Sequence, residues 1–230
     1  MNEPLKHFFS IYNFDKSQIK RVARGEKYIA VMLENGQIGV CATLKNKLTV
    51  DMDKSFTFNL DRIDHRIFYN AYLNALLNYD NEFAEDKDIF NRIDFNNYSN
   101  LVMVGYFKPL VEKFRKSGIN LSVFDLSNDD DNILQLKHQD EYVRKADGLI
   151  LTATSIFNGS FFDMVNATDG FCDVFVLGPS SILHKDIMIY KNIKTIFGTI
   201  FRKYDNQVLE IISEGYGTRY FQPLGKKVYL

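Results

Sequence analysis

The sequence predicts an α/β protein in which a small α+β domain precedes a domain built on a parallel β-sheet. Three observations predict this fold class: two β-rich runs around Asn35-Gly36, a long helical stretch that begins near Asp61, and a regular alternation of strands and helices after residue 100. Strands that are apolar along their whole length and alternate with helices are typical of a parallel sheet covered on both faces. A chain of 230 residues, of which 46% are hydrophobic, is long enough for one large core or two small ones.

The first element is a β-hairpin within "EKYIAVMLENGQIGVCATL". Its two β-rich runs flank Asn35-Gly36, a dipeptide that accepts the positive φ values of a type I′ turn. Because this turn matches the twist of paired strands, we predict a tight antiparallel hairpin here.

A helix is expected over "DRIDHRIFYNAYLNALLNYDNEF", residues 61–83, which contains neither Gly nor Pro and carries acids from Asp61 onward. Its apolar residues cover most of the circumference, so the helix should be largely buried. Asn70, Asn74 and Asn78 recur at every fourth position and share one narrow stripe. A buried amide needs partners, so this stripe faces water, backbone or a ligand cleft, and Asn74 lies deepest in the apolar run.

The polar stretch "NRIDFNNYSN", residues 91–100, has few residues suited to burial and is typical of a linker. We therefore predict one domain over residues 1–95 and a second over residues 96–230. The helix that starts at Pro109 should end at Gly118, since proline and glycine favour these two positions. The second domain should contain strands at residues 101–107, 119–126, 147–154, 173–180 and 195–201, helices at 108–118, 139–146, 160–167 and 205–213, and a last strand at 226–230.

Small or polar residues follow four of these strands. Ligands bind outside the carboxyl ends of parallel strands, where helix N-termini offer free N–H groups, so the binding site is predicted at these positions. They are Gly105 after the first strand, Asp125 after the second, Thr152, Thr154 and Asn158 after the third, and Gly178, Pro179 and Ser180 after the fourth.

The first of these turns argues against NAD as a ligand. The stretch "GYFKPL" has bulky residues where a dinucleotide fingerprint needs glycine. Asp125 nevertheless lies 20 residues beyond Gly105, the separation at which an acid can meet a ribose hydroxyl. An adenosyl ligand therefore stays open as an alternative to a helix or turn cap at Asp125.

Three motifs of the second domain carry a resemblance to a known family. Thr152-Ala153-Thr154, Asn158-Gly159-Ser160 and Gly178-Pro179-Ser180 resemble, in this order, the Thr-Gly-Thr, Asn-Gly-Thr and Gly-Pro-Ser motifs of a bacterial and archaeal family called the putative heavy-metal-chelation proteins. "GQIGVCATL" and "NAYLNALL" are similar to the amino-terminal part of this family. Ala153 and Ser160 depart from the family pattern, as does Asp125, where Glu is more usual.

The resemblance implies a two-domain protein with a cleft between the domains: an α+β domain similar to the enolase amino-terminal domain, then a Rossmann-like domain. It implies a role in making or handling metal chelators. The residues that it places at the ligand are Thr152, Thr154, Asn158, Gly178, Pro179 and Ser180, with Asn74 a candidate from the facing domain.

We therefore expect a small-molecule-binding or enzyme-like protein that acts on a metal-chelating or anionic metabolite. The alternatives are a non-catalytic adenosyl-ligand sensor that uses Asp125 and a partner-binding module. No residue pattern in the sequence specifies a reaction, a cofactor or an oligomeric state.

The composition excludes several classes of partner. With 28 Lys and Arg against 29 Asp and Glu, the chain lacks the basic excess that nucleic-acid binding needs. No apolar run approaches the roughly 20 residues of a membrane helix, and Cys41 and Cys172 are expected to be small buried residues in a reducing compartment, so we expect a cytoplasmic protein. The four histidines are scattered and are expected at the surface, so no metal site bound directly by the protein is predicted.

Overall fold

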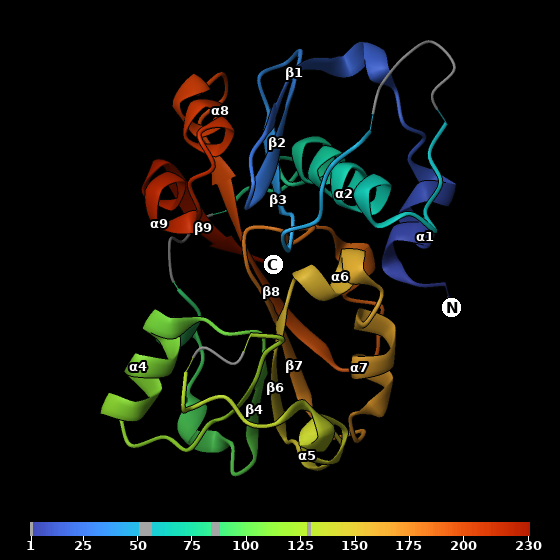
Figure 1. Cartoon of the computed structure of the whole chain (residues 1–230). Coiled ribbons are helices and arrows are strands. Elements are labelled where there is room, and N and C mark those ends of the chain that lie inside the picture. The colour runs from blue at the N-terminus through green and yellow to red at the C-terminus, as the bar shows by residue number, and fades with distance from the viewer. Residues whose placement is uncertain (1, 51–56, 84–87, 128–129) are drawn as a thin grey trace.

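The computed structural model describes residues 2–50, 57–83, 88–127 and 130–230, and its strands form two sheets. A three-stranded antiparallel sheet has the order β1-β2-β3, and a six-stranded sheet has the order β5-β4-β6-β7-β8-β9. In Figure 1 the antiparallel sheet lies above the six-stranded sheet, and α8 and α9 from the end of the chain lie beside the antiparallel sheet.

The predicted hairpin is confirmed, but its turn differs from the prediction. β2 (Tyr28–Leu33) pairs antiparallel with β3 (Ile38–Ala42), and β1 (Ile19–Arg24) pairs with the other edge of β2. Gly36 has a φ of +84°, whereas Asn35 does not have a positive φ. The type I′ prediction is therefore wrong: the Asn35 side chain accepts the Gln37 N–H, and the loop contains three residues with glycine last, as in a type I turn followed by a bulge.

Helix α2 (Ile63–Leu77) packs against one face of this sheet and is almost completely buried, as its sequence predicts. Gly39 permits the close approach, since a Cβ at that position would lie 2.1 Å from the Ala71 carbonyl oxygen of the helix. Helix α8 (Asn206–Ser213) contacts β1 and β2, and its Val208, Leu209 and Ile212 share a core cluster with Ala30 and Val40. The division into residues 1–95 and 96–230 stays a prediction; in space, α8 packs on the antiparallel sheet of the first part.

The six-stranded sheet confirms the predicted parallel architecture. Neighbouring strands pair in parallel from β5 to β8, and only β9 runs antiparallel. Figure 1 shows α4 on one side of this sheet and α5 and α7 on the other. The strands are β4 (Leu101–Val104), β5 (Ser122–Phe124), β6 (Gly148–Thr152), β7 (Asp173–Leu177), β8 (Ile193–Phe201) and β9 (Gly225–Tyr229). The helices among them are α4 (Lys108–Lys116), α5 (Gln139–Lys145), α6 (Thr154–Asn158), α7 (Phe161–Ala167) and α9 (Thr218–Phe221).

The stretch predicted as a linker, residues 91–100, contains helical turns and one buried residue, and its role as a linker between domains stays a prediction. Helix α3 (Ile89–Arg92) and a 3-10 turn at Phe95–Asn97 fold there, and Phe95 is buried. Its ring lies 4.8 Å from that of Phe114 on α4, centroid to centroid. One aromatic residue therefore fixes this polar stretch to the core, because a buried Phe contributes about 1.5–3 kcal/mol.

Helix α1 (Pro4–Ile11) precedes the hairpin and was not predicted. Cys41 and Cys172 are free and buried, as predicted. None of the helices within the described ranges combines the length and the apolar character needed to cross a membrane.

Asp64 in the first turn of α2 makes stability depend on pH. Burial alone would raise the pKa of Asp64, but hydrogen bonds from Thr49 and Arg62 and the charge of Arg62 outweigh it and lower the pKa to about 2. The pKa of Asp64 is lower in the folded state than in the unfolded state. The stabilisation is therefore complete at a pH above the unfolded-state pKa, and it is lost as the pH falls through the folded-state pKa. We expect the free energy of unfolding to drop by about 1–2 kcal/mol from about pH 4 to about pH 2 through this group.

Urea unfolding of Asp64→Asn across this pH range checks the expectation. The variant should be less stable than the wild type at pH 7 by a similar amount, and its stability should depend less on pH between 4 and 2. Asp61→Asn, at an exposed position of the same helix start, is the matched control and should follow the wild-type profile. Parallel profiles for wild type and Asp64→Asn would contradict this role.

Candidate functional site

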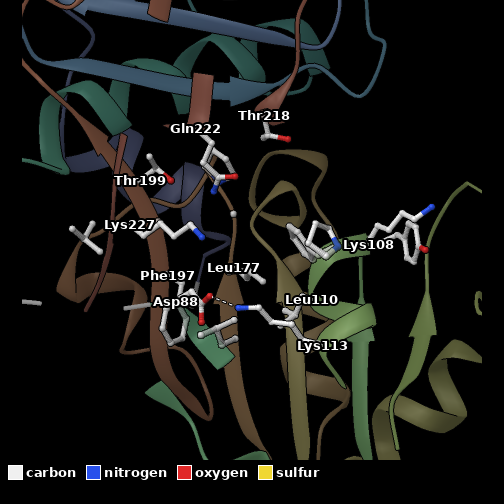
Figure 2. A pocket seen from close by; sticks show the side chains of 18 of the residues that line it. Asp88, Lys108, Leu110, Lys113, Leu177, Phe197, Thr199, Thr218, Gln222 and Lys227 are labelled. Carbon is white, nitrogen blue, oxygen red and sulfur yellow. Dashed lines mark hydrogen bonds and ion pairs between the residues drawn. The ribbon is translucent and has the colours of Figure 1, made fainter. Parts of the chain in front are cut away.

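A cavity of about 500 Å³ opens between the carboxyl ends of β4, β7 and β8 and the antiparallel sheet. This is the size of a site for a small organic molecule, and its position follows the rule for parallel sheets. Figure 2 shows side chains from α4, β8, β9 and α9 around it. Its lining residues are Tyr28, Asp88, Ile89, Tyr106, Phe107, Lys108, Pro109, Leu110, Lys113, Leu177, Gly178, Pro179, Phe197, Gly198, Thr199, Thr218, Gln222, Lys227 and Val228.

Besides Lys108, whose charge acts on Asp130, five polar residues of this lining have side chains with no internal partner. Tyr28, Thr199, Thr218, Gln222 and Lys227, here called the unpaired cavity residues, make no side-chain hydrogen bond or ion pair with any residue in the described ranges. Thr199 as a residue is only 5% exposed, but its hydroxyl, unlike Asn70 Oδ1 and Asn74 Oδ1, is not shut off from the cavity. Polar groups that converge on a cavity without internal partners are available to a ligand.

Each of the unpaired cavity residues can donate a hydrogen bond at neutral pH, and Lys227 adds a positive charge. Lys227 can only donate, and in Figure 2 its side chain extends from β9 toward the middle of the cavity. Burial raises the pKa of the Tyr28 phenol, so this hydroxyl keeps its proton. Gln222 points into the cavity from above in the same view. The set therefore suits a ligand rich in acceptor oxygens.

An ion pair also lines the cavity, on the side where Lys227 enters it. Lys113 Nζ lies 2.6 Å from Asp88 Oδ2. Burial would raise the pKa of Asp88, but Lys113, the Asn91 N–H and the charge of Lys227 hold it below its ordinary value, so this carboxylate is ionised at neutral pH. With Lys108, Lys113 and Lys227 against Asp88, the lining carries a positive excess.

Two of the predicted site residues, Gly178 and Pro179, line the cavity. Gly178 has a φ of +134°, which L side chains rarely adopt, so the glycine gives the loop after β7 its path. This path runs beside the Phe107 ring. Gly105 lies against Thr152, since a Cβ on it would be 2.6 Å from the Thr152 Cβ. The loop after β4 therefore packs directly against the end of β6, outside the cavity lining.

The other predicted polar residues lie outside the cavity lining, and the structure gives each an internal partner. Their role in ligand binding stays a prediction. The Thr152 and Thr154 hydroxyls lie 3.1 Å apart, Asn158 Oδ1 accepts the Ser160 N–H at 2.9 Å, Ser180 Oγ accepts the Ala42 N–H at 2.9 Å, Asn74 Nδ2 donates to the Val40 carbonyl at 2.9 Å, and Asp125 accepts the N–H groups of Tyr106 and Ser127 at 2.8 Å each.

The predicted asparagine stripe of α2 binds the loop that follows β7. Its amide Nδ2 groups donate to backbone carbonyls, so for them the environment is backbone, whereas the buried Oδ1 atoms of Asn70 and Asn74 have no partner in the described ranges. Because this loop supplies Gly178 and Pro179 to the cavity, the stripe fixes one cavity wall to the antiparallel sheet. The contacts run from Asn70 Nδ2 to Ser180 O (2.9 Å), from Asn74 Nδ2 to Pro179 O (3.5 Å), from Asn78 Nδ2 to Ser181 O (2.9 Å) and from Leu183 N to Asn78 Oδ1 (2.7 Å). Asn81, beyond the stripe, adds a bond from its Nδ2 to Leu183 O (3.0 Å).

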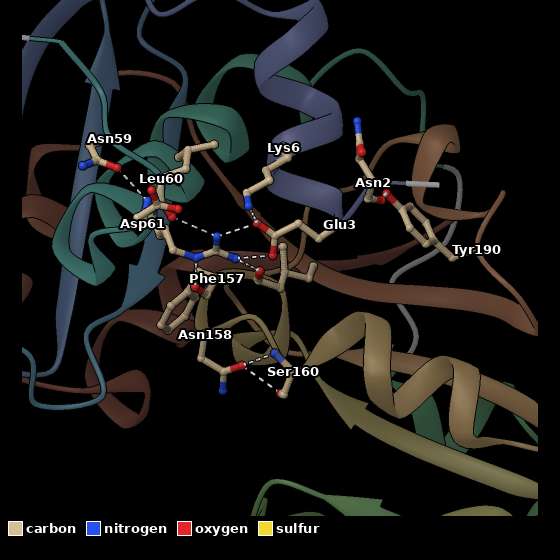
Figure 3. A network of polar contacts seen from close by, with 12 residues as sticks. Asn2, Glu3, Lys6, Asn59, Leu60, Asp61, Phe157, Asn158, Ser160 and Tyr190 are labelled. Carbon is tan, nitrogen blue, oxygen red and sulfur yellow. Dashed lines mark hydrogen bonds and ion pairs between the residues drawn. The ribbon is translucent and has the colours of Figure 1, made fainter.

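A buried arginine makes a second connection between the two parts of the fold. Arg66 on α2 is 7% exposed, and both of its terminal nitrogens donate to the Glu3 carboxylate, at 2.6 and 2.8 Å. It also donates to the carbonyls of Ile156 and Phe157 at the end of α6. Figure 3 shows this network, with Asn158 and Ser160 forming a separate local turn below it. The Asn-Gly-Ser motif therefore follows a helix whose end is held by Arg66.

The surface positions expected for the histidines are wrong for His65, which is 5% exposed and accepts the Asn59 N–H. His7 and His184 are half-buried, and both contact Asp186, His7 through its side chain at 2.8 Å and His184 by accepting its N–H at 3.2 Å. Within the described ranges, no three His, Cys, Asp or Glu side chains are grouped so as to hold a metal ion.

Family models show to which protein family this chain belongs. A family model described as "Putative heavy-metal chelation" (DUF364) matches residues 88–230, which is more than half of the chain. The chain belongs to this family. A second model with the same description (DUF4213) matches residues 10–79, so the resemblance predicted from the sequence is confirmed.

Two crystal structures of DUF364 proteins, both described as having unknown function, share the fold. The protein from Pyrococcus horikoshii superimposes with a TM-score of 0.77 at 17% identity, covering 92% of each chain. The protein from Desulfitobacterium hafniense gives a TM-score of 0.73 at 15% identity, covering 98% of this chain and 96% of that one. The predicted fold class is therefore confirmed. No curated protein matches the chain.

The family motifs did not point to the unpaired cavity residues. Thr199 offers the clearest signal that could have done so, because it is a hydroxyl within the apolar run "FGTIF". Tyr28 begins a hairpin strand, and Lys227 follows a second lysine, Lys226, in a short last strand, so neither stands out locally. Only the folded chain brings these three residues to one cavity.

Proposed function

We propose that this DUF364 protein binds a small organic anion in the cavity between its two sheets. The observation that carries the proposal is the set of five unpaired cavity residues, among which Thr199 is buried without an internal partner. An anionic ligand supplies acceptors to these donors and neutralises part of the positive excess of the lining.

The same groups favour a chelator over a bare cation. Lys227 repels a metal ion but attracts the carboxylate or phenolate oxygens that chelators carry. The family description, "Putative heavy-metal chelation", supports this direction. The metabolite, in this proposal, occupies the cavity as an anion or as a chelate whose free oxygens face Lys227.

Lys227→Met and Thr199→Val test the proposal. We expect Lys227→Met to weaken anion binding about tenfold or more, since one charge-assisted hydrogen bond contributes about 1.5–3 kcal/mol, and Thr199→Val to weaken it about fivefold. Isothermal titration with three chemically different anions, salicylate, citrate and AMP, measures this. At least one of them should bind with this dependence.

Matched controls lie on the same strands. Lys226→Met is adjacent on β9, where Nζ donates to the Phe83 carbonyl, and Thr195→Val lies on β8; neither residue lines the cavity. Both controls should bind like the wild type. Failure of all three anions, or binding unaffected by either cavity substitution, would overturn the proposal. The adenosyl-ligand alternative instead expects AMP to bind and Asp125→Ala to weaken it.

A further inference from the structure

The first turn of α4, which lies at the cavity, is poorly suited to phosphate, and this narrows the ligand class within the proposed function. Phosphate sites use several free N–H groups of a helix N-terminus or a glycine-rich turn. Helix α4 begins at the cavity with Phe107 as its N-cap, and Pro109 has no N–H. The N–H groups of Leu110 and Val111 already donate to the Phe107 carbonyl. The first turn of α4 thus offers the cavity one backbone N–H, that of Lys108.

The charges of the cavity match a single negative group better than a double one. Lys227 is the lining cation that extends to the middle of the cavity, whereas Lys113 is paired with Asp88. Asp88 is near enough to Lys227 to feel its charge, so its carboxylate also repels an anion bound there. A phosphate monoester carries close to two charges at neutral pH and meets more of this repulsion than a carboxylate does.

The walls beside Lys227 favour a flat apolar body. Phe107, Leu177 and Phe197 line the cavity together with Pro179, Leu110 and Val228. Rigid rings and aliphatic side chains bind an aromatic ligand through burial of its faces and through offset or edge contacts between rings. The neutral side chains of Tyr28, Thr218 and Gln222 come from the antiparallel sheet, from α9 and from the 3-10 turn after α9. There they can bond a polar substituent at the far end of such a ring system.

We infer that the cavity selects an aromatic monocarboxylate over the corresponding phosphate ester and over the neutral amide. Lys227 holds the carboxylate, the Phe107 and Phe197 walls contact the ring system, and Gln222 and Tyr28 bond a polar substituent. The inference rests on the proposed function and adds the class of its ligand.

Three probes that share one ring system test it: 2-naphthoate, 2-naphthyl phosphate and 2-naphthamide, titrated at the same ionic strength into the wild-type protein and into Lys227→Met. We expect 2-naphthoate to bind about tenfold more tightly than either of the other probes. In Lys227→Met, 2-naphthoate should bind no more tightly than 2-naphthamide. In the matched control Lys226→Met, 2-naphthoate should still bind more tightly than the amide.

The outcomes separate the two proposals. If 2-naphthyl phosphate binds as tightly as 2-naphthoate or more tightly, and loses affinity in Lys227→Met, the carboxylate inference is overturned while anion binding in the cavity stands. If 2-naphthamide binds as well as both anions, the aromatic carboxylate is the wrong ligand class. The same holds if none of the three probes binds while salicylate, citrate or AMP binds and loses affinity in Lys227→Met. If no anion of either series depends on Lys227, both proposals fall.

Discussion

Replacing Arg66 with alanine is expected to lower the free energy of unfolding by about 3–5 kcal/mol, because the change leaves a charged carboxylate without its buried partner. Arg66 donates to Glu3, to the Leu60 carbonyl and to two carbonyls at the end of α6. One side chain thus joins the start of the chain, α2 and the motif region after β6. Its loss removes a hydrogen bond from each of these acceptors, and Glu3 keeps only its longer ion pair with the exposed Lys6, at 3.9 Å. Urea unfolding monitored by circular dichroism measures the effect.

Arg62 on the same helix is the matched control. It pairs with Asp64, but half of its side chain is exposed, and Arg62→Ala should lower stability by only about 1 kcal/mol. Glu3→Gln, which keeps the shape of the acceptor and removes its charge, should fall between the two. Equal losses for Arg62→Ala and Arg66→Ala would show that the buried network does not hold the two parts together.

Asn78→Ala is expected to lower the free energy of unfolding by about 2–4 kcal/mol. Both ends of the Asn78 amide are used, since Nδ2 donates to Ser181 O and Oδ1 accepts the Leu183 N–H, and the residue is 2% exposed. Truncation leaves a buried donor and a buried acceptor unpaired, at about 1–3 kcal/mol for each such group. Because the loop after β7 forms one cavity wall, the affinity of any cavity ligand should fall as well.

Asn81→Ala provides the comparison, because its single bond to Leu183 lies in a half-buried position and should contribute about 1 kcal/mol. The account requires the Asn78 variant to be clearly the less stable of the two, both in denaturant midpoint and in ligand affinity. If the two variants are equally stable, the stripe does not fix the loop.

The parts of the fold that the sequence predicts correctly are those with strong local periodicity. Continuous apolar runs such as "GLILT" predict β6 and its neighbours, and the all-round apolar helix predicts the burial of α2. The turn at Asn35-Gly36 was misassigned because the dipeptide fits two turn types, and the Asn35 side-chain bond to Gln37 decides between them. Phe95 was missed because one aromatic residue among polar neighbours gives no periodic signal.

The candidate site was predictable in location but not in its residues. The strand-end rule leads to Gly178 and Pro179, which line the cavity. Hydroxyls and amides near the same ends, such as Thr154 and Asn158, have local partners instead. Which polar group is satisfied internally and which is free for a ligand depends on contacts between residues far apart in the chain, as with Ser180 and Ala42, and periodicity carries no information on these.

The most direct test of the central claim is a crystal structure of the protein soaked with salicylate, citrate and AMP in separate experiments. We predict an ordered anion within hydrogen-bond distance of Lys227 Nζ, with Thr199 or Gln222 as a second contact, in at least one of them. An anion ordered at Thr154 and Asn158 while the cavity holds only solvent would contradict the account and would return the site to the family motifs.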